Sequence, residues 1–507
     1  MNFVSARMPE ALLSPGNTPW DLPVQNRRPG RNWCRDHHWC PYNEVVGSFY
    51  VENFGCRATQ ADGAAIERQL ADRGLSRAGT AADAEIVVLN TCTVTSAADQ
   101  DARAAIRRIH RANPAARILV TGCYAQRAPE EISALDGVSL VVGNSHKHRL
   151  AEIAVAGNFV SLASLVVPPT VAVAGGHRAP VVVEDIFAHT ELLAAPVFDS
   201  DHEKTRPNLK VQDGCNNRCS FCVIPFVRGS SRSLPLEEVL RNVDQLVRNG
   251  YQELVLSGIN LGRWGRDLRP DLQSPSGARA AAPDRARFVD LLEAILGRTQ
   301  VPLLRISSVE PMDWSDELIA LAAASPRIAK HAHVPLQSGS DRILRRMHRR
   351  YRPWHYEDRI QRIHAAMPQA AIGADVMVGF PGESEQDFEE TRAFIERLPF
   401  SYLHVFTYSS RPGTPSAKMS EQVPVHQARE RNRALRELAA RKKRSFQEQF
   451  LGETLPALTL THVSDGRTEA LTGNYQKLWI EGLLPANRML TARIHSIEGE
   501  ALVGEVE

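Results

Sequence analysis

The chain has 507 residues, a formal net charge of +2 and eight cysteines. Its length predicts about three folded units, and its near-neutral charge means that any site for a polyanion must be a local patch. It has no run of about twenty apolar residues, no secretory leader and no cysteine framework, so we expect a cytoplasmic protein without membrane spans or a disulfide scaffold.

Residues 1–45 are rich in Pro, Asn, Arg and Trp and show no hydrophobic periodicity. We expect them to form a poorly ordered extension. The segment from Cys34 to Cys40, CRDHHWC, has two interpretations. It is either a weak metal site or a set of incidental residues in an unfolded arm.

Residues 46–150 alternate short apolar runs with helix-like segments. The apolar runs lie at 49–51, 85–89 and 117–120. Strand, loop and helix, repeated three times, predict a small doubly wound parallel sheet.

One cysteine follows each of these predicted strands: Cys56, Cys92 and Cys123. The loops at the carboxyl edge of a doubly wound sheet converge on one crevice. We therefore expect these three thiols to meet in space, although they are far apart in the sequence.

Residues 151–205 are rich in Ala, Val and Pro, and we interpret them as a linker that packs partly as strands. Strand and helix signals alternate again in residues 206–440. Six candidate strands lie at 209–212, 253–257, 303–307, 331–336, 371–378 and 402–408. Six β/α units predict a partial or full barrel, whose active site forms at the carboxyl ends of the strands. The stretch from Arg266 to Arg287 is typical of a surface insertion.

The stretch KVQDGCNNRCSFCVIPFVRGSSR follows the first of these strands. Its cysteines, Cys215, Cys219 and Cys222, have the spacing C-x3-C-x2-C. Thiolates are the usual ligands of iron–sulfur clusters, and three ligands on a four-iron cluster leave one iron open for chemistry. Three buried structural cysteines are the alternative, but the surrounding Gly, Asn and Arg are not core residues.

This stretch resembles the radical S-adenosylmethionine (SAM) superfamily. The resemblance implies a [4Fe-4S] cluster whose open iron binds SAM and whose electron cleaves it to methionine and a 5′-deoxyadenosyl radical. Polar residues at later strand ends, namely Asn260, Glu310, Gln337 and Asp375, resemble family segments and are candidates for binding SAM. Each of the four has an alternative role as a cap or turn residue. Arg228 and Arg232 face either a cluster or the substrate, or they are solvated loop residues.

The end of the chain changes character. A helix-like stretch, 425–450, is strongly basic between Arg429 and Arg444, which indicates either a solvated face or phosphate contacts. Residues 441–507 hold short alternating strands, typical of a small antiparallel barrel of the oligonucleotide-binding kind.

The segments around Cys56, Cys92 and Cys123 resemble the N-terminal domain of the methylthiotransferases. This resemblance implies a second [4Fe-4S] cluster on these three cysteines, which carries or donates sulfur, and a C-terminal TRAM domain that binds tRNA. Cys34 and Cys40 match nothing in the family pattern.

Three motifs, NTCTVT, GCNNRC and TGNY, look most like the branch that acts on threonylcarbamoyl-adenosine. The expected reaction adds a methylthio group to C2 of that base at position 37 of tRNA, next to the anticodon. The alternatives are isopentenyl-adenosine in tRNA, an aspartate of a ribosomal protein, or a non-catalytic iron–sulfur RNA-binding protein. We expect a monomer that takes electrons from a donor such as a flavodoxin or a ferredoxin.

Overall fold

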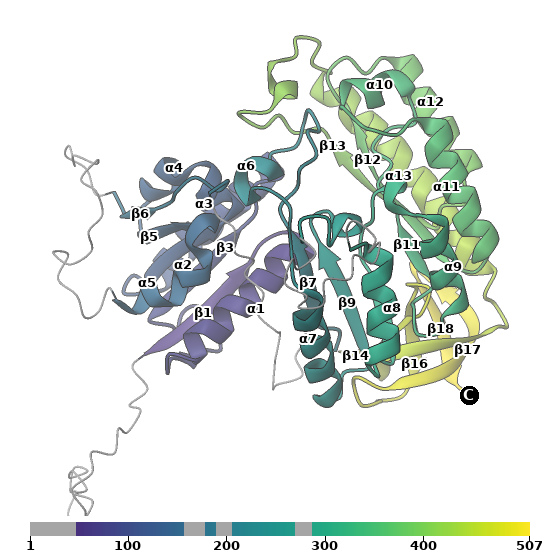
Figure 1. The fold of residues 1–507 in the computed structure, drawn as a ribbon, viewed down its shortest axis with the longest axis horizontal. Helices are drawn as coiled ribbons and strands as arrows, with labels where there is room; N and C mark the ends of the chain where they lie inside the picture. Colours follow the sequence, from purple (N-terminus) through teal and green to yellow (C-terminus); the bar gives the residue numbers. More distant parts are fainter. Residues whose placement is uncertain (1–46, 157–177, 189–204, 269–285) are drawn as a thin grey trace, which may run out of the picture. The chain divides into compact units, whose positions relative to one another are not determined.

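A computed structural model describes residues 47–156, 178–188, 205–268 and 286–507. The N-terminal extension with Cys34 and Cys40, and most of the insertion from Arg266 to Arg287, lie outside the described residues. Figure 1 shows three folded parts in chain order. None of the helices within the described ranges combines the length and the apolar character of a membrane span.

The first part is a six-stranded parallel sheet with the order β2-β1-β3-β4-β5-β6. Its strands are β1 Ser48–Asn53, β2 Ser76–Arg77, β3 Ile86–Thr91, β4 Arg117–Gly122, β5 Val138–Gly143 and β6 Val181–Val182. Its helices are α1 Arg57–Ala71, α2 Ser96–Ala112, α3 Cys123–Arg127, α4 Pro129–Ser133, η1 Asn144–Arg149 and α5 Leu150–Ala156.

Helices cover both faces of this sheet. Val88 packs with Ile66 of α1 on one face, and Val87 packs with Ile106 of α2 on the other. Because both faces are buried, β3 is a continuous apolar run rather than an alternating one. The predicted doubly wound parallel sheet is confirmed, and β6 extends it with residues from the stretch that we interpreted as a linker.

The second part is a partial barrel, in which six strands form two parallel sheets with three of these strands each. They are β7 Asn208–Asp213, β9 Glu253–Gly258, β10 Leu303–Ile306, β11 His331–His333, β12 Ala371–Val378 and β13 Tyr402–Thr407. Bridges from Leu304 to Ile328 and from Ser308 to His333 join the two halves of the wall, and β8 Arg232–Ser233 runs antiparallel to β7. This confirms the predicted β/α barrel.

Helices lie between the barrel strands, and the longer ones pack around the outside of one apolar core. They are α6 Ile224–Arg228, α7 Leu236–Arg248, η2 Leu261–Arg263, α8 Phe288–Arg298, η3 Pro311–Asp313, α9 Asp316–Ala324, α10 Asp341–Arg346, α11 Pro353–Ala366, α12 Glu385–Arg397 and η4 Pro415–Lys418. The long helix α13 Val425–Glu448 follows and packs against β13 through Leu435 and Leu438.

The third part is a closed five-stranded barrel with the order β14-β15-β16-β18-β17. Its strands are β14 Thr454–Ser464, β15 Arg467–Thr472, β16 Lys477–Glu481, β17 Met489–Glu498 and β18 Ala501–Val506. All pairs are antiparallel except β16 with β18, which is parallel. The small, mainly antiparallel barrel expected for a TRAM domain is confirmed.

The turn between β15 and β16 closes the amino end of the larger barrel. The ring of Tyr475 lies 4.5 Å from the ring of His331, the first residue of β11. Arg305 on β10 donates to the carbonyl oxygens of Thr472 and Gly473, both at 3.2 Å, and lies over the Tyr475 ring. The TGNY segment is therefore a plug between two domains.

Candidate active site

The first cysteine triplet, Cys215, Cys219 and Cys222, lies in the loop after β7. Polar groups surround its sulfurs: the amide of Asn217 donates to Cys215 Sγ at 3.4 Å, and Arg349 Nη1 donates to Cys219 Sγ at 3.3 Å. Burial raises the pKa of the Cys222 thiol to about 12. Because only thiolates bind iron, cluster assembly here must release protons.

Two of the predicted SAM residues lie beside this triplet. Asn260 Nδ2 is 3.6 Å from Cys215 Sγ, while its Oδ1 is buried and has no hydrogen-bond partner in the described part of the chain. Glu310 pairs with Arg349, the residue that donates to Cys219. A small pocket over Cys219 includes Arg218, Glu310 and Arg349 in its wall. Three thiols therefore lie next to the free oxygen of Asn260, the carboxylate of Glu310 and the guanidinium of Arg349. This set of groups fits an iron–sulfur cluster with an amino-acid ligand.

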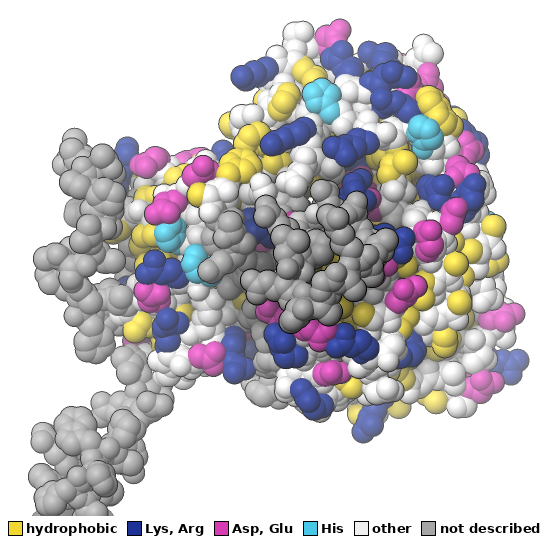
Figure 2. Space-filling view, in the orientation of Figure 1, with side chains coloured by type: hydrophobic (Ala, Val, Ile, Leu, Met, Phe, Trp, Pro, Cys, Tyr) yellow, Lys and Arg dark blue, Asp and Glu magenta, His cyan; other side chains and the backbone are white. Residues whose placement is uncertain are grey.

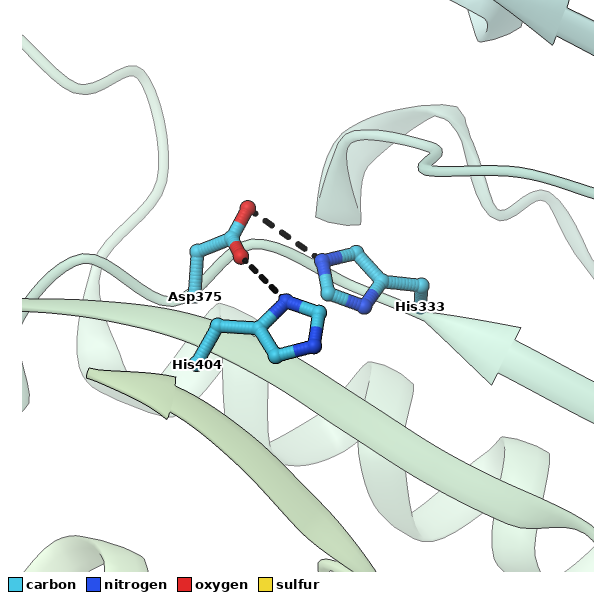
Figure 3. Close-up of side chains that lie close together, drawn as sticks. All are labelled: His333, Asp375 and His404. Carbon is cyan, nitrogen blue, oxygen red and sulfur yellow. Dashed lines mark hydrogen bonds and ion pairs between the residues drawn. The ribbon is translucent and has the colours of Figure 1, made fainter. Parts of the chain in front are cut away.

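The other two predicted SAM residues lie further round the barrel wall. Gln337 adopts a left-handed backbone with φ 67°, and its amide donates to the Asp375 carbonyl oxygen at 2.8 Å. The carboxylate of Asp375 bonds His333 Nε2 at 3.2 Å and His404 Nδ1 at 3.3 Å (Figure 3). Burial alone would raise the pKa of Asp375, but these two imidazoles outweigh it and hold the pKa well below its usual range.

The second triplet lies at the carboxyl edge of the first sheet. Cys56 follows β1, Cys92 follows β3, and Cys123 begins α3 after β4. The backbone at Gly55 approaches Cys92 so closely that a Cβ on Gly55 would lie 2.9 Å from Cys92 Sγ. Burial and then the neighbouring Cys123 raise the pKa of Cys92 to about 12.

Buried polar atoms without partners gather near this second triplet. Within the described ranges, Asn90 Oδ1, Thr121 Oγ1 and Asn144 Oδ1 have none, and Asn144 Nδ2 lies 3.6 Å from Cys123 Sγ. Such orphaned groups are rare in proteins. Three converging thiols with unsatisfied polar atoms around them fit an iron–sulfur cluster.

A buried charge network links the two triplets. Arg228, at the end of α6, donates to Asp213 at 3.0 Å and to Asp62 on α1 at 2.9 Å. Lys147 and Lys210 also pair with Asp62. All five side chains are buried, and three cations face two carboxylates.

The network extends to the second triplet through Thr59. Arg228 Nη2 donates to Thr59 Oγ1 at 3.4 Å, and Cys56 Sγ lies 3.5 Å from that same oxygen. The alternative of a solvated loop for Arg228 is therefore wrong. Arg232 is half-buried and donates to the Ser230 carbonyl oxygen.

The loop after β13 forms a second contact between the two parts. Ser96, just after Cys92, donates its amide to Ser409 Oγ at 3.0 Å. Arg411 donates to Thr93 Oγ1 at 2.8 Å and pairs with Asp99. The carboxyl end of β13 therefore leads directly to the segment that carries Cys92.

The basic helix α13 has charges that pair within the protein and others that face solvent; the interpretation as phosphate contacts stays a prediction. Arg431 is buried and pairs with Glu383, Lys442 donates to the Leu398 carbonyl oxygen, and Lys443 pairs with Glu500. Five other arginines are exposed: Arg429, Arg433, Arg436, Arg441 and Arg444, the last of which pairs with Glu448.

Sequence reasoning missed Asp62, Lys147, Arg349, His333 and His404. Nothing in the sequence indicated that Asp62 and Lys147 are buried, because a polar residue on a helix is normally exposed. A signal did exist for their partners, since Lys210 and Asp213 occur inside a strand that is otherwise buried.

Two family models match the chain. The radical SAM superfamily matches residues 209–395, and "Uncharacterized protein family UPF0004" matches residues 48–143. The first match covers most of the barrel and the cysteine triplet after its first strand. Fold and site thus define a radical SAM protein, whose cofactors are a [4Fe-4S] cluster and SAM.

Relatives extend over nearly the whole chain. "Threonylcarbamoyladenosine tRNA methylthiotransferase MtaB" of Aquifex aeolicus (strain VF5) is 36% identical over 87% of this chain and 99% of its own. The Bacillus subtilis (strain 168) protein of the same name is 36% identical over 84% and 89%. "tRNA-2-methylthio-N(6)-dimethylallyladenosine synthase" of Novosphingobium aromaticivorans is 33% identical over 82% and 88%. The chain belongs to the methylthiotransferase family of radical SAM proteins.

A solved structure is similar in fold. The radical SAM methyltransferase TsrM of Kitasatospora setae, solved with cobalamin and a [4Fe-4S] cluster, superposes with a TM-score of 0.50 over 83% of this chain and 76% of its own. Its sequence identity is 14%, so this likeness concerns the fold alone.

Proposed function

We propose that the chain adds a methylthio group to C2 of N6-threonylcarbamoyladenosine at position 37 of tRNA, beside the anticodon. The observation that carries this proposal is the pair of cysteine triplets, Cys56, Cys92 and Cys123 with Cys215, Cys219 and Cys222, at strand ends joined by one buried charge network. The resemblance to relatives named for this reaction, over nearly their whole length, supports the choice of base.

Each triplet has a separate role in this proposal. Cys215, Cys219 and Cys222 hold the cluster that binds SAM, and Cys56, Cys92 and Cys123 hold a second [4Fe-4S] cluster. When bound, the first cluster and SAM supply a 5′-deoxyadenosyl radical by reductive cleavage. The protein's own part is ligation, orientation and exclusion of water.

Four side chains are proposed to orient SAM. Asn260 and Glu310, which lie beside the triplet, face its amino-acid end. Gln337 and Asp375 lie further round the wall and face its nucleoside end. The plug at Tyr475 closes the opposite end of the barrel, so it helps to keep water from the lumen.

Basic side chains near the first triplet support a polyanionic partner. Lys and Arg gather around α10 (Figure 2), and the segment after this helix touches the cluster loop, where the Ser220 amide donates to the Met347 carbonyl oxygen at 3.1 Å. Exposed Arg218 and Arg350 pair with no acid among the described residues. We propose that these cations, with the TRAM barrel, grip tRNA phosphates while the target base leaves the anticodon stack.

Mass spectrometry of tRNA nucleosides tests the proposal. A strain that lacks the gene should accumulate threonylcarbamoyl-adenosine without its methylthio group, and the wild-type gene should restore that group. The Cys215→Ala variant should not restore it. If only the methylthio group of isopentenyl-adenosine, or that of a ribosomal aspartate, disappeared, the proposed base would be wrong.

Reconstituted protein can test two further proposals, on the electron donor and on the oligomeric state. We propose that a flavodoxin or a ferredoxin supplies the electron and that the chain acts as a monomer. Reconstituted protein should cleave SAM with either reduced donor, and its sedimentation should match a single chain.

A further inference from the structure

Three polar side chains line the lumen of the larger barrel on three adjacent strands: His333 on β11, Asp375 on β12 and His404 on β13 (Figure 3). Asp375 lies directly opposite His404 in the strand register, and His333 lies opposite Gly373. Because side chains two residues apart point to the same face of a strand, all three share one side of the wall.

The lumen face of β13 is open. The His404 side chain is 52% exposed and Phe406 is 46% exposed, whereas Val405 between them is buried against the core below α13. The two rings lie 6.4 Å apart in an edge-to-face arrangement. An exposed aromatic ring and an exposed imidazole inside a barrel form a surface suited to a flat, partly polar ligand.

The imidazole of His404 is held in one orientation. Its Nδ1 bonds the Asp375 carboxylate at 3.3 Å, and its Nε2 has no hydrogen-bond partner among the residues that the structure describes. The other oxygen of Asp375 is held by His333, whose Nδ1 lies 3.0 Å from the Tyr402 hydroxyl. This hydroxyl also lies 2.7 Å from His331 Nε2. These contacts hold the His404 ring through Asp375. They leave its Nε2 facing the lumen without a partner among the described residues.

The position of this surface matches the demands of the reaction. The carboxyl end of β13 leads to Ser409 and Arg411, which touch the segment after Cys92. Across the barrel, the strand end of β7 carries Cys215. The surface formed by His404 and Phe406 therefore lies on a strand whose carboxyl end reaches the segment of the second triplet.

The chemistry of the two family substrates differs at N6 of the adenine. A threonylcarbamoyl group carries a carboxylate, a hydroxyl and an amide-like carbamoyl, whereas a dimethylallyl group is a hydrocarbon. An imidazole nitrogen that faced a hydrocarbon would lose its water without gaining a partner, which is costly. Because Nδ1 of a neutral ring donates to Asp375, its Nε2 accepts a hydrogen bond, which the hydroxyl or an N–H of the threonylcarbamoyl group can donate.

We propose that His404, positioned by Asp375, recognises the polar substituent at N6 of the target adenine, and that the ring of Phe406 packs against the base. This inference rests on the proposed function and deepens it. It makes His404 the residue by which the enzyme prefers a threonylcarbamoyl base to a dimethylallyl one.

The test compares full-length reconstituted proteins on two tRNA anticodon-loop substrates, one with threonylcarbamoyl-adenosine and one with dimethylallyl-adenosine at position 37. The variants are His404→Ala, His404→Gln, whose amide keeps both an acceptor and a donor, and the matched control His355→Ala on the outer face of α11, where the side chain is exposed. Iron per chain confirms that all variants carry the same clusters. The readouts are kcat and KM for the methylthiolated product.

For His404→Ala we expect kcat/KM on the threonylcarbamoyl substrate to fall about two- to ten-fold, mainly through KM, because one hydrogen bond between neutral groups is lost. The preference over the dimethylallyl substrate should fall by the same factor. His404→Gln should recover part of it, and His355→Ala should match wild type.

Three results would overturn the inference. One is an equal loss on both substrates, which would indicate a structural role. Another is an unchanged preference in His404→Ala. The third is Co²⁺ bound stoichiometrically by the cluster-loaded wild type and lost in the variant, because His333, Asp375 and His404 would then form a metal site. A wild-type enzyme that modifies only the dimethylallyl substrate would instead overturn the proposed function itself.

Discussion

The guanidinium of Arg228 lies 2.9 Å from the carboxylate of Asp62, so the radical-cluster loop of the barrel is tied to the first helix of the N-terminal sheet. Both side chains are buried, Arg228 to 2% and Asp62 to 1% relative exposure. A pair of this kind is costly to bury and much more costly to break, because the remaining partner would be an uncompensated charge. The two cysteine triplets are therefore held at a fixed separation by charges, not only by apolar packing.

Removal of Arg228 should loosen this connection. Arg228→Met leaves Asp62 and Asp213 without their shared partner, and we expect a loss of about 3–5 kcal/mol in the free energy of unfolding of the barrel and the N-terminal sheet. Urea denaturation followed by circular dichroism measures it. Arg298→Ala, which breaks the exposed pair with Glu237, is the control and should leave the urea midpoint unchanged. Equal midpoints for both variants would contradict a role of the network in stability.

The same network predicts sensitivity to acid. Burial would raise the pKa of Asp213, but Arg228 and Lys210 outweigh it and hold the pKa well below its usual range. A carboxylate with a depressed native pKa stabilises the fold above its unfolded pKa of about 3.9, and this contribution is lost as pH falls below that value. We expect the contribution of Asp213 to the thermal midpoint to be constant between pH 8 and 5 and to be lost as the pH falls below about 4. The acid-side drop should be smaller in Asp213→Asn, which is already uncharged.

The contact between Arg349 and Cys219 should govern the first cluster. Removal of a residue that hydrogen-bonds to a metal ligand typically lowers metal affinity or activity about ten- to a hundred-fold. Arg349→Met should therefore lower iron retention and reduce SAM cleavage at least about ten-fold, and it should make the cluster potential more negative because a donor to sulfur is lost. Redox titration followed by electron paramagnetic resonance measures the potential. Arg362→Met, on the exposed surface of α11, is the control and should keep the iron content, SAM cleavage and cluster potential of the wild type.

The two triplets should contribute equal amounts of iron. Anaerobic reconstitution of the wild type should give about eight irons per chain, and the triple Ala variant at Cys215, Cys219 and Cys222 about four. The triple Ala variant at Cys56, Cys92 and Cys123 should also hold about four irons but still cleave SAM. SAM cleavage retained without Cys215, Cys219 and Cys222 would refute the assignment of the radical cluster.

The plug at Tyr475 should hold the TRAM barrel against the larger barrel. Tyr475→Phe keeps the contacts with His331 and Arg305 and loses only the hydroxyl that accepts from Arg57 at 3.3 Å, so we expect near wild-type stability. Tyr475→Ala loses both ring contacts and should cost about 1–3 kcal/mol. Limited proteolysis should release the C-terminal barrel faster from Tyr475→Ala than from the wild type, and Tyr475→Phe should behave like the wild type. Identical cleavage of the two variants would show that the ring is not part of the plug.

Local signals were enough to predict the architecture. Apolar runs followed by helical segments predicted β1, β3 and β4, and short alternating runs predicted all five strands of the C-terminal barrel. These predictions held because periodicity and turn residues are properties of neighbours in the chain. The spacing of Cys215, Cys219 and Cys222 is likewise local, and a triplet within eight residues can surround one cluster in almost any fold.

The tertiary structure alone decided which distant residues meet. Asp62 and Arg228 are 166 positions apart, and Ser96 and Ser409 are 313 positions apart, so no periodicity relates them. Their pairing follows from two sheets that present their carboxyl edges to each other and from the cost of leaving any buried charge unpaired. The sequence by itself therefore determined the three folded parts, the two cysteine triplets and the family. Only the structure shows that Asp62 pairs with Arg228 between two folded parts and that Asp375 pairs with His404 in the barrel. The physical reason is that burial and charge pairing act through space and not along the chain.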